Sequence, residues 1–119
     1  MPTVSVLLPV HNAVRYLPTA LESVTRQAGV DFDVVVVDDG STDGSAETAE
    51  RIAESAKRSD SDAMRHAPCA MRVYRLPYNL GVTEALRFGL DRCESKYVAR
   101  QDADDVSFGD RLRFQVAFL

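Results

Sequence analysis

Apolar and polar residues follow two different periods along this chain of 119 residues. Short apolar runs rich in β-branched residues predict strands, and stretches with apolar residues three or four positions apart predict helices. Strands are expected over 4–10, 32–37, 71–76 and 97–101. Helices are expected from about 17 to 24, over 46–56, over 83–93 and from about 108 onward. This alternation predicts an α/β fold, a Rossmann-like three-layer α/β/α arrangement with a mainly parallel sheet.

Local signals refine these elements. The run from Phe32 to Val37 is almost entirely apolar, which is typical of a strand covered on both faces. Pro18 fits only the first turn of its helix, and Asn12 is a plausible helix cap. Residues 58–68 are polar and aperiodic, and are expected to form a mobile surface loop. In the third helix, the residues expected to face inward are Ala85, Leu86, Phe88 and Leu90.

Acidic residues follow two of the predicted strands. Asp38 and Asp39 come directly after the second strand, and the run Asp102-Ala103-Asp104-Asp105 follows the fourth. Because ligands of parallel sheets bind at the carboxyl ends of the strands, both clusters are expected to share one crevice. Three carboxylates within four residues repel one another unless a cation joins them, and Mg²⁺ or Mn²⁺ prefers such oxygen ligands. A solvated acidic loop is the alternative interpretation.

Composition limits the function classes. The chain has the length of one domain, with 45% apolar and 27% charged residues, as in ordinary soluble proteins. A net charge of −4 argues against nucleic acid as a partner. Cys69 and Cys93 form no C-x-x-C pair, which favours a reducing, cytoplasmic location. The sequence also has no signal-peptide pattern and no transmembrane-length apolar run.

Four motifs occur together in order. They are VSVLLPVHN at 4–12, VDDGSTDGS at 37–45, Asn79-Leu80-Gly81, and the acid run at 102–105. In combination they resemble the family 2 glycosyltransferases of the A-type glycosyltransferase fold, over essentially the whole chain. The resemblance implies that residues 1–119 are a nucleotide-diphospho-sugar-binding domain, the truncated N-terminal part of a longer transferase.

The resemblance also implies roles for the residues that follow the first three strands. Asp39 is the expected contact to a nucleobase, with Asp38 nearby, because a carboxylate accepts the hydrogen bond of a uracil imide N–H. The alternative is that both acids cap the turn and the next helix. Pro9, Val10 and His11 are expected to line the nucleoside pocket. Gly81 would let the backbone approach a phosphate or turn tightly.

For the acid run, the resemblance implies a D-x-D motif. Asp104 is then the ligand of Mn²⁺ or Mg²⁺, and Asp102 contacts the ribose or a metal-bound water. Asp105 either belongs to the same site or caps a helix beginning near Ser107. Three arginines near strand or helix ends, Arg75, Arg87 and Arg100, are weaker candidates for diphosphate contacts, since a solvent-facing arginine is the commoner case.

The implied activity is metal-dependent transfer of a sugar from a nucleotide-diphosphate sugar, with a UDP-sugar as the expected donor, to an acceptor hydroxyl on a glycan, lipid or other molecule. The family is generally inverting, and its general base lies in the C-terminal half, so no catalytic residue is assigned in this chain. We therefore expect donor binding only, with a fragment inactive by itself. The full-length protein could be membrane-associated, and the face left by the missing half could support self-association.

Three other functions fit less well. A non-catalytic module that binds nucleotide-sugar or a partner chain remains open. A receiver domain would place its acid pair after the first strand and a phosphorylated aspartate after the third. Here the pair follows the second strand, and no acid comes directly after Leu76, at the end of the third strand. A dinucleotide oxidoreductase would need G-x-G-x-x-G after the first strand, and the sequence has none there.

Overall fold

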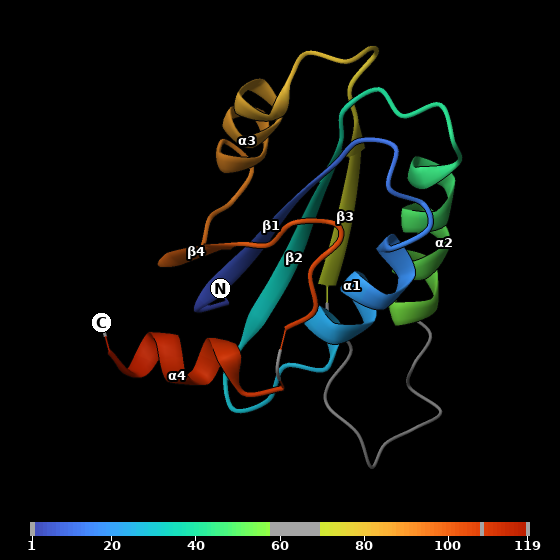
Figure 1. Cartoon of the computed structure of the whole chain (residues 1–119). Helices are drawn as coiled ribbons and strands as arrows, with labels where there is room; N and C mark the ends of the chain where they lie inside the picture. The colour runs from blue at the N-terminus through green and yellow to red at the C-terminus, as the bar shows by residue number, and fades with distance from the viewer. Residues whose placement is uncertain (1, 58–69, 108, 119) are drawn as a thin grey trace.

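A computed structural model describes residues 2–57, 70–107 and 109–118 (Figure 1). Strands and helices alternate along these residues, as the sequence predicts. The strands are β1 (Val4–Val10), β2 (Phe32–Asp38), β3 (Ala70–Arg75) and β4 (Tyr97–Arg100). The helices are α1 (Leu17–Thr25), α2 (Ser45–Lys57), α3 (Val82–Leu90) and α4 (Arg111–Ala117). The loop predicted over 58–68 lies outside the described residues.

The strands form one sheet in the order β3-β2-β1-β4, and every neighbouring pair is parallel. Val6 of β1 is in register with Val34 of β2 and with Ala99 of β4. The prediction of a mainly parallel sheet is therefore confirmed. Because the strands run in one direction, the segments that follow them meet along a single edge of the sheet.

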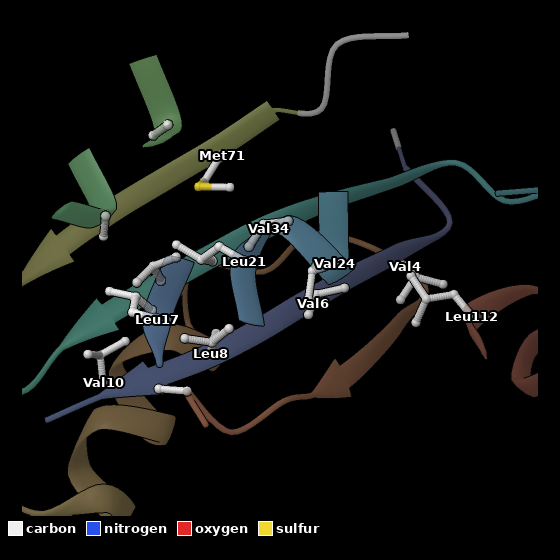
Figure 2. Close-up of a cluster of buried hydrophobic side chains, with 14 residues drawn as sticks. Val4, Val6, Leu8, Val10, Leu17, Leu21, Val24, Val34, Met71 and Leu112 are labelled. Atoms are coloured by element: carbon white, nitrogen blue, oxygen red, sulfur yellow. The ribbon is translucent and has the colours of Figure 1, made fainter. Parts of the chain in front are cut away.

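Helices cover both faces of the sheet. On one face, side chains of β1 and β2 pack against α1, with Met71 of β3 at one end of the cluster and Leu112 of α4 at the other (Figure 2). On the opposite face, a smaller cluster joins Leu7, Val35 and Val37 to Ala85 of α3. Val34 to Val37 of β2 are fully buried between these layers, and the predicted three-layer arrangement is confirmed.

Close packing of α3 on the sheet depends on Gly89. A Cβ atom at this position would lie 2.2 Å from Leu7 Cδ1 and 3.1 Å from Val37 Cγ2, so only glycine lets the helix approach so closely. Ala85 and Gly89, four residues apart, mark the buried stripe. Leu90 lies about 100° further round the helix and is exposed, so the prediction that it faces inward is wrong.

The segment between β1 and α1 differs from the sequence prediction. Helix α1 begins at Leu17, with Pro18 in its first turn, so Asn12 is too far away to cap it. Asn12 has a φ of 49° and bonds instead to the turn after β2. Its Oδ1 accepts the Thr42 N–H at 2.8 Å, and its own N–H donates to Ser41 Oγ at 2.9 Å. Asn12 therefore joins the loops that follow β1 and β2 at the carboxyl edge of the sheet.

Within the described ranges, the helices are too short or too polar to cross a lipid bilayer.

Candidate functional site

Asp39 joins the end of β2 to the loop that precedes α3. Its carboxylate is buried and accepts two backbone hydrogen bonds, from Leu80 N to Oδ1 at 2.7 Å and from Gly81 N to Oδ2 at 3.0 Å. Its own N–H donates to the Val10 carbonyl at 2.7 Å. Asp39 thus fixes the ends of three segments relative to one another. Each carboxylate oxygen still has a second lone pair with which to accept a ligand N–H.

Both ring nitrogens of His11 form hydrogen bonds. Nδ1 lies 2.9 Å from the Asp39 carbonyl oxygen, which can only accept, so Nδ1 carries the proton. Nε2 lies 2.8 Å from Asn79 Nδ2 and accepts from it, while Asn79 Oδ1 accepts the Gly81 N–H at 3.1 Å. A hydrogen-bonded circuit therefore runs from Asp39 through His11 and Asn79 to Gly81. The sequence identified Asn79 only as part of a motif.

Pro9 and Val10 contribute chiefly backbone to this edge. Val10 packs its side chain into the core, and Pro9 is half-buried. Gly81, directly before α3, has a φ of 100°, which glycine adopts readily and other residues rarely do. A Cβ there would meet no atom within 4 Å, so conformation rather than crowding requires glycine.

Asp38 has a different environment from its neighbour. It is buried, and its Oδ2 accepts the Ser41 N–H at 3.0 Å, which closes the turn after β2. Its Oδ1 is buried without a hydrogen-bond partner among the described residues. Asp38 and Arg75 help to line a hollow of about 440 Å³ beside the start of α2. The contacts of Asp38 are those of a turn-forming residue.

Asp43 fastens the loop before α1 to the start of α2. Burial opposes its ionisation, but hydrogen bonds from Ser45 Oγ and from the backbone N–H groups of Val14 and Ser45 outweigh this, so the pKa of Asp43 is lowered. The Val14 N–H reaches Asp43 Oδ2 at 3.1 Å, and the Ser45 N–H reaches Oδ1 at 3.0 Å. Asp43 therefore acts as a cap for α2 and as a tie between loops.

The acid run after β4 brings three carboxylates together. Asp102, Asp104 and Asp105 are exposed, and one oxygen from each lies within 4.8 Å of the others. Asp102 Oδ1 is also 3.2 Å from the Arg100 guanidinium. A set made only of oxygen donors, open to water and to a phosphate, fits Mg²⁺ or Mn²⁺. This part of the chain can therefore hold the divalent cation expected from the sequence.

Asp105 does not cap a helix. Helix α4 begins only at Arg111 and follows Asp110, because residues 101–107 form an irregular loop. The Asp105 N–H donates instead to the Asp102 carbonyl at 3.1 Å, which folds the acid run into a turn. From the sequence alone, no role was assigned to Gln101 and Arg111, although their side chains hold this loop. Their partners lie up to eleven residues away along the chain, and no spacing pattern in the sequence pointed to these bonds.

The three arginines considered from the sequence all have carboxylate partners. Arg75 pairs with Glu47 and Glu50 of α2, and Arg87 pairs with Glu84 within α3. The hydrogen bond from Arg75, assisted by its charge, lowers the pKa of Glu50 against a smaller effect of burial. Arg100, paired with Asp102, is the arginine adjacent to the acid run.

Both acid clusters lie at the carboxyl edge of the sheet, after β2 and β4, with β1 between them. Each cluster has its own neighbouring hollow. Besides the hollow at Asp38, one of about 270 Å³ lies at the acid run and is lined by Gln101, Asp105, Ser107 and Arg111, among others. His11 follows β1 and stands between the two clusters in the strand order.

The sequence pattern for the glycosyl transferase family 2 matches residues 5–119. The chain belongs to glycosyltransferase family 2. An uncharacterized glycosyltransferase from Haemophilus influenzae is 30% identical over the whole of this chain, which covers 43% of that protein. Glycosyltransferase GlyG from Streptococcus pneumoniae is 27% identical over 87% of this chain and 30% of its own length. The family resemblance seen in the four motifs is confirmed.

Solved structures agree with this assignment. TarS 1–349 from S. aureus, in complex with UDP-GlcNAc, has a TM-score of 0.78 at 28% identity over 97% of this chain and 30% of its own. The mannosyltransferase PcManGT from Pyrobaculum calidifontis, in complex with GDP-Man and Mn²⁺, has a TM-score of 0.75 at 27% identity, covering 88% of this chain and 28% of its own. The chain has the A-type glycosyltransferase fold and spans less than half the length of these relatives.

Proposed function

We propose that this family 2 domain binds a nucleotide-diphosphate sugar, with UDP as the nucleotide, together with Mn²⁺ or Mg²⁺. The protein that contains it transfers the sugar to an acceptor hydroxyl with inversion at the anomeric carbon. In that reaction the bond from the anomeric carbon to the diphosphate oxygen breaks, a bond to the acceptor oxygen forms, and the hydroxyl proton passes to a general base. No base is assigned within residues 1–119, whose proposed contribution is donor binding.

The observation that carries this proposal is the cluster of three exposed carboxylates after β4, at the same sheet edge as the Asp39 circuit. The complexes of TarS with UDP-GlcNAc and of PcManGT with GDP-Man and Mn²⁺ support a nucleotide-sugar ligand and a divalent cation. UDP is the nucleotide of the TarS complexes, and the GDP-Man complex of PcManGT makes GDP the alternative to be tested.

In the proposed complex, Asp104 is the protein ligand of the cation, and Asp102 contacts the ribose or a water on the cation. Asp105 is a third carboxylate within reach. A bound divalent cation would neutralise the diphosphate and stabilise the departing nucleoside diphosphate as a Lewis acid.

On the nucleoside side, we assign Asp39 to accept the base N–H through a lone pair left over from its two backbone bonds. Pro9, Val10 and His11 border the base, Asp38 maintains the turn beneath it, and Gly81 shapes the backbone near the phosphates.

The test is calorimetric titration of the folded chain with UDP and with GDP, each with and without Mn²⁺. We expect UDP to bind only when Mn²⁺ is present, and more tightly than GDP. Asp104→Asn should weaken Mn²⁺-dependent UDP binding at least tenfold, whereas Asp91→Asn, an exposed acid after α3, should leave it unchanged. A folded wild-type chain that binds neither nucleotide with Mn²⁺ present would refute the proposal, and tighter GDP binding would refute the choice of base.

A further inference from the structure

Gln101 is a buried amide placed between β4 and the acid run. Only 3% of the residue is exposed. Its backbone N–H continues the sheet by donating to the Leu7 carbonyl at 3.0 Å. Its side-chain Nε2 turns toward the loop and donates to the Asp105 carbonyl at 2.9 Å. One residue therefore connects the central strand β1 to the last member of the acid run.

The other end of the Gln101 side chain is equally engaged. Oε1 accepts hydrogen bonds from the Ser107 hydroxyl and from Arg111 Nη1, the latter at 2.9 Å. Arg111 Nη1 also donates to Ser107 Oγ at 3.0 Å, and its Nη2 donates to the Arg100 carbonyl at 2.9 Å. The Arg111 guanidinium thus joins Arg100, at the end of β4, to Ser107, at the end of the loop.

Helix α1 supplies a further anchor, because the Ser107 N–H donates to Ser23 Oγ at 3.0 Å. Across the loop, these bonds involve backbone groups and the side chains of Ser23, Gln101, Ser107 and Arg111. The carboxylates of the acid run take no part in them, and Asp102 instead forms an ion pair with Arg100. The loop backbone is therefore fixed while its three carboxylates remain open to a ligand.

Fixing the backbone matters because the three carboxylates repel one another. In a flexible loop the like charges would move apart. Cation binding would then also have to supply the free energy that orders the loop. A loop that is already ordered avoids that cost. We propose that Gln101 and Arg111 are positioning residues that hold the carboxylates of the acid run in place for a divalent cation. This inference rests on the proposed function, since it presumes that the acid run binds the cation.

Two substitutions that keep the net charge test it. Gln101→Met keeps the approximate length of the side chain and removes its three hydrogen bonds. Arg111→Lys keeps the positive charge but lacks the planar fork that reaches both Ser107 and Arg100. The matched controls are Gln115→Met and Arg113→Lys, which make the same chemical changes at exposed positions of α4.

The probe is Mn²⁺ alone, titrated against the full chain while electron paramagnetic resonance reports free Mn²⁺. We expect each test substitution to raise the Mn²⁺ dissociation constant about tenfold, equivalent to about 1.4 kcal/mol, and each control to leave it unchanged. Circular dichroism restricts the comparison to folded samples. Because Arg111 is only half-buried, Arg111→Lys remains decisive should Gln101→Met fail to fold.

A purely structural role would lower the melting temperature without changing Mn²⁺ affinity in the folded protein. Wild-type Mn²⁺ affinity in the folded variants would therefore overturn the inference while leaving the proposed function intact. Failure of the wild-type chain to bind Mn²⁺ would instead overturn the metal assignment, and this inference with it.

Discussion

Replacing Asp39 with asparagine should destabilise the chain strongly, apart from any effect on ligand binding. The buried carboxylate accepts N–H groups at 2.7 and 3.0 Å. Asparagine offers one oxygen, so its NH₂ group must face the other backbone N–H, and that donor loses its charged acceptor; the Leu80 N–H would have no replacement, whereas the Gly81 N–H would keep its 3.1 Å bond to Asn79 Oδ1. A hydrogen bond to a charged group contributes about 1.5–3 kcal/mol, and the surviving bond becomes a weaker neutral one. The expected loss is about 3 kcal/mol in the free energy of unfolding.

At about 4 °C per kcal/mol for a domain of this size, the melting temperature should fall by about 12 °C. Thermal and urea unfolding followed by circular dichroism would measure both quantities. Asp31→Asn is the matched control, because it makes the same chemical change at an exposed position in the loop before β2. A loss below about 1 kcal/mol for Asp39→Asn would mean that the two backbone bonds do not hold the loop, and the reasoning would be wrong.

Two further substitutions test the packing of α3 and the ion pairs of α2. Gly89→Ala gains about 1 kcal/mol of helix propensity but places a Cβ within 2.2 Å of Leu7 Cδ1. We therefore expect the free energy of unfolding, measured with urea, to fall by about 1–2 kcal/mol. A more stable variant would contradict the close packing of α3 on the sheet. The lowered pKa of Glu50 stabilises the fold above the ordinary carboxyl pKa, and this contribution is lost as pH falls through the folded pKa. Glu50→Gln should therefore flatten the acid limb of stability measured at low salt, and an unchanged limb would rule out the pair with Arg75.

The parts of the structure that could be predicted depend on patterns repeated along a whole element. The apolar run of β2 indicated burial on both faces, and its residues Val34 to Val37 are fully buried. Alternation of strands and helices then fixed a parallel sheet, which brings Asp39 and the acid run to one edge. Each inference uses many residues, so one ambiguous position does not change it.

The parts that could not be predicted depend on single side chains and their tertiary partners. Asn12 has the residue type of a helix cap, but the chain turns at this position and its amide bonds to the next loop. Leu90 follows the apolar pattern of α3, yet the close approach at Gly89 rotates it toward solvent. Gln101 and Asn79 act through bonds to residues that only the fold brings near. Composition and spacing contain no direct signal for such pairs.

The short strand β4 gives the two halves of the site unequal local stability. It has four residues and pairs with β1 alone among the described strands, whereas β2, which ends at the Asp38-Asp39 pair, has partners on both sides. Strand β4 lies at one edge of the sheet, and the loop that leaves it can be followed in Figure 1 as it passes across the sheet toward α1. Edge strands of a sheet unfold locally more readily than central strands, so backbone amides of β4 should exchange with deuterium faster than those of β2. A ligand that bridges the two halves would slow that exchange, so slower deuterium exchange of the β4 amides would report ligand binding.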